Sequence, residues 1–117
     1  MSRALTQAAA AEAMDEVPVG AVLVSAEGKI LAEAHNRTIT NSDPCAHAEI
    51  EALRKAGQTL GNYRLLNTTL YVSLEPCAMC AMALVHARIK RLVYAAADPK
   101  TGACGSVFNL LDDPRHN

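Results

Sequence analysis

Four short apolar segments of the chain have the length and composition of buried strands. The first two are Gly20–Val24 and Lys29–Ala34, and Ala26-Glu27-Gly28 between them has the composition of a tight turn with Gly28 at positive φ. The other two, Thr69–Ser73 and Arg91–Ala95, each follow a longer segment of helical character. The pattern therefore predicts an antiparallel hairpin followed by two further strands.

Two of the longer segments predict helices before the third strand. Residues 3–16 are rich in alanine, which has the highest helix propensity of all residues. Residues 46–56 carry apolar side chains on one side, and we expect Gly57 and Gly61 to end this helix.

A third helix is predicted over residues 76–88, with Pro76 at its first position, where a missing N–H costs nothing. From residue 29 onward the order is strand, helix, strand, helix, strand, which is typical of parallel strands joined by helical crossovers. Together with the hairpin this predicts an α/β fold, with a mixed sheet covered by helices on both faces. At 117 residues the chain is expected to form a single domain, residues 1–117.

Composition narrows the function classes. Half of the residues are apolar and 20% are charged, which disfavours disorder, and the net charge of −1 gives no general attraction to polyanions. No apolar run is long enough to span a membrane or to act as a secretion signal, so we expect no membrane partner. Four cysteines without secretory features indicate a reducing compartment, and we expect a cytoplasmic protein.

Two short motifs about thirty residues apart carry the chemistry. His47-Ala48-Glu49 and Pro76-Cys77-Ala78-Met79-Cys80 offer one imidazole, two thiols and a carboxylate. His47, Cys77 and Cys80 form a three-ligand zinc set, which leaves a fourth coordination position for water. Both motifs fall where a predicted helix begins, and the partial positive charge of a helix N-terminus lowers the pKa of a thiol.

Glu49 is expected to act as the proton carrier. Zinc with two thiolates and a neutral imidazole is formally uncharged, so it acidifies water less than a site with three histidines, and a nearby base must help. His47 and Glu49 are two residues apart and would point in opposite directions along a regular helix. They can share a cleft only in the first turn, which we therefore expect to contain both.

Two other chemistries fit parts of this pattern. The two cysteines of Cys77-x-x-Cys80 resemble a redox dithiol, although such a site needs no His-x-Glu motif. The second is a closed Cys₃His structural zinc site, formed by Cys45 with His47, Cys77 and Cys80, which would bind no water. Otherwise Cys45 and Cys104 are expected to be small buried side chains.

The chain resembles the bacterial tRNA-specific adenosine deaminase family (TadA) of the cytidine/deoxycytidylate deaminase superfamily over nearly its whole length. The His-x-Glu and Pro-Cys-x-x-Cys motifs are the signature of zinc nucleobase deaminases. Further segments match in order and spacing: Glu16–Ala21, Asn36-Arg37, His47–Ile50, Asn62–Leu65, Leu74–Cys80 and Asp98–Ala103.

This resemblance implies a three-layer α/β/α cytidine-deaminase-like fold, one Zn²⁺ per subunit and a homodimer. It also implies hydrolysis of adenosine to inosine at the wobble position of a tRNA anticodon stem-loop. By position, His47, Cys77 and Cys80 would bind zinc and Glu49 would shuttle protons. Substrate contacts would come from Asn36 to the flipped purine, from Ala48 and Leu74 to the pocket wall, and from Asp98 and Lys100 near the nucleic-acid backbone.

The chain departs from the family at its C-terminal end, where the usual further strand and long helix are expected to be missing. Two other functions stay open at this point. The first is a free-base or nucleoside deaminase of the same fold, acting on guanine or cytosine, because the metal and the carboxylate are shared. The second is a zinc-stabilised module without catalytic activity.

Overall fold

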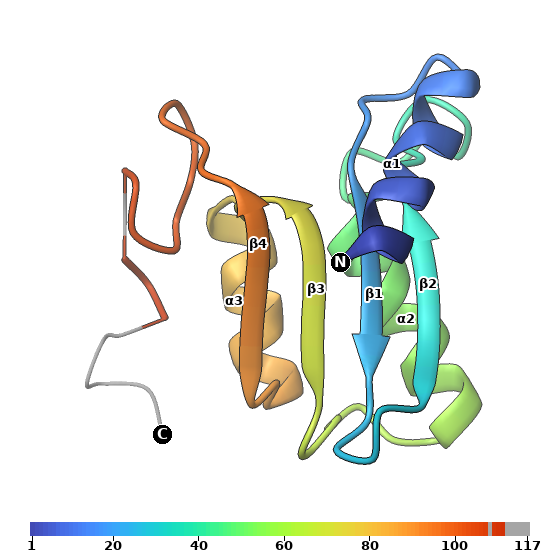
Figure 1. Cartoon of the computed structure of the whole chain (residues 1–117), viewed down its shortest axis with the longest axis vertical. Coiled ribbons are helices and arrows are strands. Elements are labelled where there is room, and N and C mark those ends of the chain that lie inside the picture. The colour runs from blue at the N-terminus through green and yellow to red at the C-terminus, as the bar shows by residue number, and fades with distance from the viewer. Residues whose placement is uncertain (108, 112–117) are drawn as a thin grey trace.

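Within the described part of the chain, residues 1–107 and 109–111, the computed structural model contains three helices and four strands (Figure 1). Their order is the one that the apolar pattern predicts. The elements are α1 (Ser2–Ala13), β1 (Gly20–Val24), β2 (Ile30–His35), α2 (Ala48–Leu60), β3 (Thr69–Leu74), α3 (Ala78–Ala87) and β4 (Arg91–Ala96).

The four strands form one mixed sheet in the order β2-β1-β3-β4. β1 is antiparallel to both β2 and β3, and β3 is parallel to β4. The helix α1 lies over one face of the sheet, while α2 and α3 lie over the other (Figure 1). The predicted three-layer α/β/α class with a mixed sheet is therefore confirmed, and the turn glycine Gly28 has the expected positive φ of 85°.

Small side chains bring the helices close to the sheet. Ala48, Ala52 and Ala56 recur every fourth residue on the buried side of α2 and pack in the same core as Leu70 and Val72 of β3. Because β3 alternates between buried and partly exposed positions, its apolar side chains all enter one layer. Burial of this apolar surface is what holds α2, and the histidine before it, against the sheet.

α1 ends three residues earlier than the sequence predicts. Helical propensity favours residues 3–16, but the last helical residue is Ala13. Asp15 takes a left-handed conformation with φ of 58°, and the chain turns so that Glu16 points its carboxylate into the loop that follows β2. Tertiary hydrogen bonds thus override the local propensity.

The other helix ends also differ in part from the prediction. Gly57 lies inside α2 and does not end it, whereas Gly61 does, as the C-cap residue with φ of 66°. Pro76 does not occupy the first helical position of α3, because Cys77 is the N-cap and Ala78 begins the helix. Pro76 instead fixes the extended approach to the cap.

The strand and long helix that are expected from the sequence to be missing would follow Asn117, and residues 112–117 themselves lie outside the described residues. On that side, β4 is the outermost strand of the described sheet. None of the described helices has the length and apolar character needed to cross a membrane.

Candidate metal centre and substrate pocket

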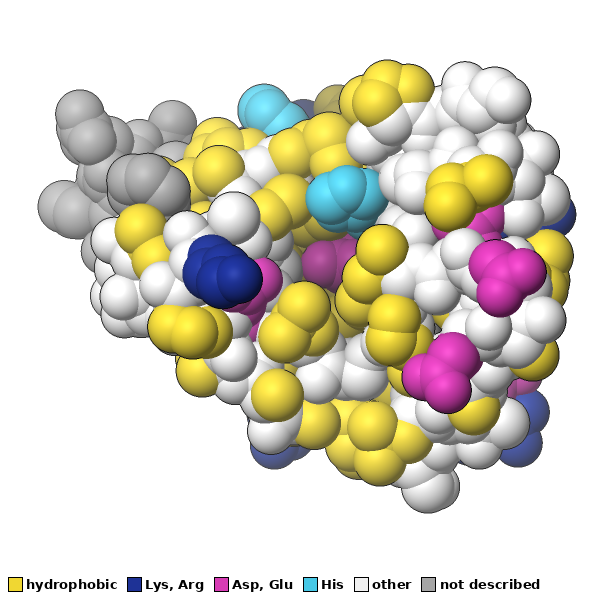
Figure 2. Space-filling view, turned by 90° about the horizontal axis from the view of Figure 1, so that it is seen from above, with side chains coloured by type: hydrophobic (Ala, Val, Ile, Leu, Met, Phe, Trp, Pro, Cys, Tyr) yellow, Lys and Arg dark blue, Asp and Glu magenta, His cyan; other side chains and the backbone are white. Residues whose placement is uncertain are grey.

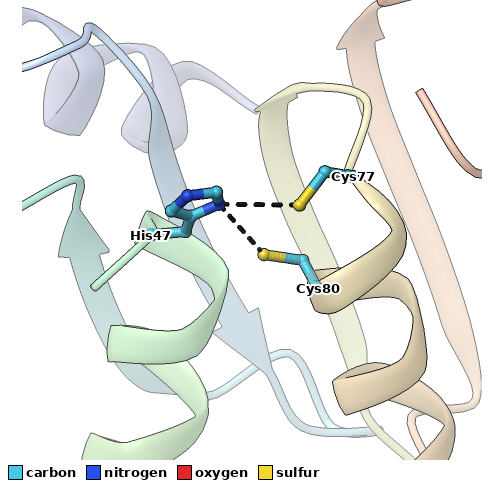
Figure 3. Close-up of side chains that lie close together, drawn as sticks. All are labelled: His47, Cys77 and Cys80. Atoms are coloured by element: carbon cyan, nitrogen blue, oxygen red, sulfur yellow. Dashed lines mark hydrogen bonds between the residues drawn. The ribbon is translucent and has the colours of Figure 1, made fainter. Parts of the chain in front are cut away.

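Two helix starts bring three candidate metal ligands together. His47 is the N-cap of α2 and Cys77 is the N-cap of α3, both with extended backbone, and Cys80 lies in the first turn of α3. The Nδ1 atom of His47 lies 3.7 Å from the Sγ of Cys77 and 3.4 Å from the Sγ of Cys80 (Figure 3). The three ligand atoms all lie within 4.8 Å of one another.

These distances fit a tetrahedral zinc ion. Usual zinc–sulfur and zinc–nitrogen bond lengths place neighbouring ligand atoms about 3.6 Å apart at a tetrahedral angle. Two thiolates and one imidazole are also a donor set typical of zinc. The three side chains are therefore arranged to hold a zinc ion with little rearrangement.

Cys45 does not join this group. In the described chain, the cluster able to hold a metal contains His47, Cys77 and Cys80. The side chain of Cys45 is exposed on the loop before α2, so the prediction that it is buried is wrong. The closed Cys₃His site considered from the sequence is not formed.

The two thiols differ in their readiness to lose a proton. A hydrogen bond from Cys80, backbone N–H groups of Cys80 and Met79 at the start of α3, and the charge of His47 lower the pKa of Cys77 to about 5, against the opposing effect of burial. The hydrogen bond to Cys77 raises the pKa of Cys80, as do burial and the nearby Glu49. Cys77 thus loses its proton readily, and a bound cation would favour loss of the proton from Cys80 as well.

Glu49 is buried in the first turn of α2, with 4% of its surface exposed. Burial raises the pKa of its carboxyl above the usual value, although its backbone hydrogen bond and the charge of His47 oppose this. A carboxyl group with a raised pKa holds a proton more readily than an exposed one and can pass it on.

A pocket of about 260 Å³ opens beside these groups. Figure 2 views this end of the molecule, where histidine and acidic side chains border a hollow surrounded by hydrophobic side chains. His47, Glu49 and Cys77 line the pocket. Its other lining residues are Val17, Val19, Asn36, Thr38, Ala48, Leu74, Glu75, Asp98 and Thr101.

Most of the substrate contacts expected from the sequence fall in this pocket. Asn36, Ala48, Leu74 and Asp98 line it, whereas Lys100 does not and is exposed on the neighbouring loop. The backbone N–H of Lys100 donates to Asp98 at 2.9 Å, as part of a turn that also lowers the pKa of the Asp98 carboxyl. Lys100 is thus a surface residue between Asp98 and Thr101, which both line the pocket.

The amide of Asn36 is held in one orientation. Its Nδ2 donates to Oε1 of Glu16 and to Oγ1 of Thr38, each at 3.3 Å. Glu16 also accepts hydrogen bonds from Ile39 and Thr40 of the same loop. Because the Asn36 donor is engaged, its amide oxygen is the group that can accept a hydrogen bond from a ligand in the pocket.

Sequence reasoning missed two buried carboxylates next to the site, Glu16 and Glu75. Burial raises the pKa of Glu16, but the hydrogen bonds from Thr40, Ile39 and Thr38 outweigh it and lower the pKa overall. Glu75 directly precedes Pro76 and Cys77 and accepts hydrogen bonds from the loop after β4. The sequence signal for each was its place inside a segment that matches the deaminase family, Glu16–Ala21 or Leu74–Cys80.

Curated relatives carry names that match this chemistry. Over 117 residues the chain is 57% identical to the tRNA-specific adenosine deaminase of Haemophilus influenzae, covering 100% of this chain and 68% of that protein. It is 47% identical over 117 residues to the protein of the same name from Bacillus subtilis, covering 72% of it.

Solved structures of two deaminases share the fold of this chain. A structure from a study of A-to-I editing by tRNA:A34 deaminases at the wobble position of transfer RNA has a TM-score of 0.95 and 48% identity, covering 100% of this chain and 89% of that one. The guanine deaminase of Bacillus subtilis has a TM-score of 0.78 and 46% identity, covering 82% of this chain and 61% of that one.

The family comparison covers the part of the chain that holds all three candidate ligands. Residues 1–96 match the model of the cytidine and deoxycytidylate deaminase zinc-binding region. The match agrees with the geometry of the His47, Cys77 and Cys80 cluster. The chain therefore belongs to the cytidine and deoxycytidylate deaminase family, whose cofactor is zinc.

Proposed function

We propose that this protein hydrolyses adenosine to inosine at the wobble position of a tRNA anticodon stem-loop, releasing ammonia. The observation that carries the proposal is the pocket that holds Glu49, His47 and Cys77 together, in a chain 57% identical to a tRNA-specific adenosine deaminase. Anticodon loops present bases that are already unpaired, so moving one into a pocket costs little.

His47, Cys77 and Cys80 hold one zinc ion in this proposal. When bound, the metal supplies Lewis acidity that activates water for attack on C6 of the base. Glu49 accepts the proton of that water and delivers it to N1 of the purine. Glu49 next takes the remaining proton from the hydroxyl now on C6 and gives it to the amino group, which leaves as ammonia when the C6–N bond breaks. The raised pKa of Glu49 suits both transfers.

Asn36 orients the base. Its amide oxygen accepts a hydrogen bond from the exocyclic amino group on C6, the N–H donor that adenine offers, because the Nδ2 group is engaged by Glu16 and Thr38. Leu74 and the backbone at Ala48 form the walls of the pocket, while Asp98 and Lys100 approach the nucleic-acid backbone at its mouth. Val17 and Val19 add apolar surface to the same pocket.

A free-base deaminase is the second candidate, since the chain also resembles the guanine deaminase of Bacillus subtilis. The tRNA:A34 deaminase structure covers more of the chain with a higher TM-score, which favours the tRNA substrate. A zinc module without activity is disfavoured because, among the described residues, three ligands and not four gather beside the pocket.

One experiment separates the two substrates. Zinc-loaded protein is incubated with an RNA hairpin carrying adenosine at the wobble position, and inosine is measured by mass. A hairpin with cytidine at that position and free guanine are run in parallel. Turnover of the adenosine hairpin alone is expected, whereas turnover of guanine without the hairpin would overturn the proposed substrate.

We further propose that the chain forms one domain and acts as a homodimer in the cytoplasm, where tRNA is modified. An apolar groove between the later parts of α2 and α3, lined by Leu53, Tyr63, Leu65, Ala83 and Ala87 among others, supports a second copy as its occupant. Light scattering coupled to size-exclusion chromatography tests this: a mass of one chain would contradict the dimer.

A further inference from the structure

Glu75, the residue before Pro76, has a buried carboxylate that is neither a candidate metal ligand nor the candidate proton carrier. Glu75 lines the pocket and has only 2% of its surface exposed. Its carboxylate faces a loop more than twenty residues away in sequence, residues 98–106. A buried carboxylate is costly unless hydrogen bonds compensate it.

Four donors from this loop compensate the Glu75 carboxylate. Oε1 accepts from the backbone N–H of Asp98 at 3.1 Å and from the hydroxyl of Ser106. Oε2 accepts from the backbone N–H groups of Cys104 at 3.0 Å and Ser106 at 3.1 Å. Both ends of the loop are thus held by hydrogen bonds to the side chain of Glu75.

Gly102 makes this approach possible. A Cβ atom on Gly102 would lie 2.5 Å from both Cδ and Oε2 of Glu75, and 2.5 Å from the carbonyl oxygen of Asp98. Only a residue without a side chain lets the loop close around the carboxylate. The glycine of the Lys-Thr-Gly segment is therefore explained by Glu75.

The backbone reinforces the same attachment. The N–H of Glu75 donates to the carbonyl of Ala96 at 2.8 Å, and the N–H of Ala103 donates to the carbonyl of Pro76 at 2.9 Å. Cys77, the N-cap of α3, is the next residue. The loop is thereby fixed to the segment that places a metal ligand.

The loop in turn supplies one side of the pocket, through Asp98 and Thr101. We propose that Glu75 is a positioning residue for substrate binding: it fixes the 98–106 loop to the start of α3, and so sets Asp98 and Thr101 relative to the catalytic groups. This rests on the proposed function for its kinetic part only. Glu75 itself takes no proton and touches no metal.

The proposal distinguishes substrate binding from the chemical step. His47, Glu49, Cys77 and Cys80 lie on the starts of α2 and α3 and do not depend on the loop for their contacts with one another. Loosening the loop should therefore raise KM for the RNA more than it lowers kcat. Zinc content should stay at that of the wild type.

The test uses Glu75→Gln, which keeps the shape of the side chain but turns one acceptor into a donor facing N–H and O–H groups. Ser106→Ala is the milder second variant, since it removes the hydroxyl alone. Glu27→Gln, on the exposed turn between β1 and β2, is the matched control, and Glu16→Gln perturbs the other loop-binding carboxylate.

Hydrogen exchange of the zinc-loaded proteins is measured first. Amides in residues 98–106 are expected to exchange about tenfold faster in Glu75→Gln and less so in Ser106→Ala, because fewer hydrogen bonds hold the loop. Glu16→Gln should accelerate exchange in residues 36–40 and leave 98–106 unchanged. Glu27→Gln should match the wild type in both loops.

Kinetics on the adenosine hairpin are read second. KM is expected to rise about tenfold in Glu75→Gln with kcat within about threefold of the wild type. Wild-type exchange and KM in both variants would overturn the proposal, as would loss of zinc and of global protection in Glu75→Gln with a normal Ser106→Ala. If Glu75→Gln does not fold, Ser106→Ala decides alone by the same readings.

Failure of the proposed function gives a different result. If the wild-type protein does not deaminate the hairpin, the assigned substrate is wrong. The exchange measurements still decide whether Glu75 fixes the loop. The two conclusions can therefore fail separately.

Discussion

Glu49 is a buried carboxyl group beside the candidate metal site. Its role can be tested by a substitution that changes neither the burial of the side chain nor the metal ligands. Glu49→Gln preserves size and hydrogen-bonding shape but cannot carry a proton. Zinc should remain at one per chain, while the rate of inosine formation should fall by about 10²–10⁴-fold. Metal analysis and the hairpin assay check both parts, and wild-type turnover would remove Glu49 from the mechanism.

The buried carboxylate of Glu75 also predicts how the stability of the protein depends on pH. The hydroxyl of Ser106, with N–H groups of Ser106, Asp98 and Cys104, lowers its pKa from 4.5 to about 2 against the effect of burial. Because the folded pKa lies below the ordinary one, the carboxylate contributes stability that is complete above pH 4.5 and is lost as the pH falls toward 2.

The measurement is the melting temperature of wild type and Glu75→Gln across this range. The wild type should melt higher near neutral pH, and the difference should shrink as the solution is acidified below pH 4.5. The exposed Glu27→Gln serves as the control. A difference that grows on acidification would contradict the sign of the pKa shift.

At the scale of elements, the two glycines near the end of α2 have opposite roles despite their similar sequence context. Gly57 lies within the helix, and a Cβ there would meet the Asn62 carbonyl at an ordinary 3.4 Å. Gly57→Ala should therefore stabilise the protein by about 0.5–1 kcal/mol. Gly61 has φ of 66°, so Gly61→Ala should destabilise it by about 1 kcal/mol. Urea unfolding of the two variants checks these signs, and two shifts of the same sign would be inconsistent with the observed helix end.

The same glycines show what the sequence does and does not predict about elements. The strands β1 and β3 were predicted to within one residue, because apolar composition and alternation reflect burial directly. The end of α1 was not, since Glu16 is held by Thr40, a contact that forms only after the chain folds. For α2, Gly61 forms the cap as expected, but the helix runs past Gly57 to Leu60.

Some residues of the candidate site can be predicted from the sequence and others cannot. His47, Glu49, Cys77 and Cys80 were identified because their chemistry is carried by short motifs. Glu16 and Glu75 were not, because a carboxylate that binds a loop looks like any other until residues 36–40 and 98–106 fold against it. Motifs therefore predict the reacting groups, and tertiary structure is needed for the residues that position them.

At the scale of the whole molecule, the candidate metal site joins two parts of the chain. His47 precedes α2, after the β1–β2 hairpin, while Cys77 and Cys80 lie at the start of α3, after β3. The strands β1, β2 and β3 are neighbours in one sheet, so the sheet already connects these two parts of the chain. Zinc binding therefore adds a link between the two helix starts that the apolar core does not provide. Ligand binding to the folded state alone stabilises it, by about 4 kcal/mol at a thousand times the Kd.

Removal of zinc by a chelator should consequently lower the melting temperature of the wild type, with the largest loss of amide protection at the starts of α2 and α3. The central strands β1 and β3 should stay protected, because Leu23, Leu70 and Val72 remain buried without the metal. Cys77→Ser is the control: it should melt near the chelated wild type and respond little to chelator, since one thiolate ligand is gone. A wild type whose melting temperature and exchange are indifferent to the chelator would mean that the cluster does not hold a metal in solution, whatever its geometry permits.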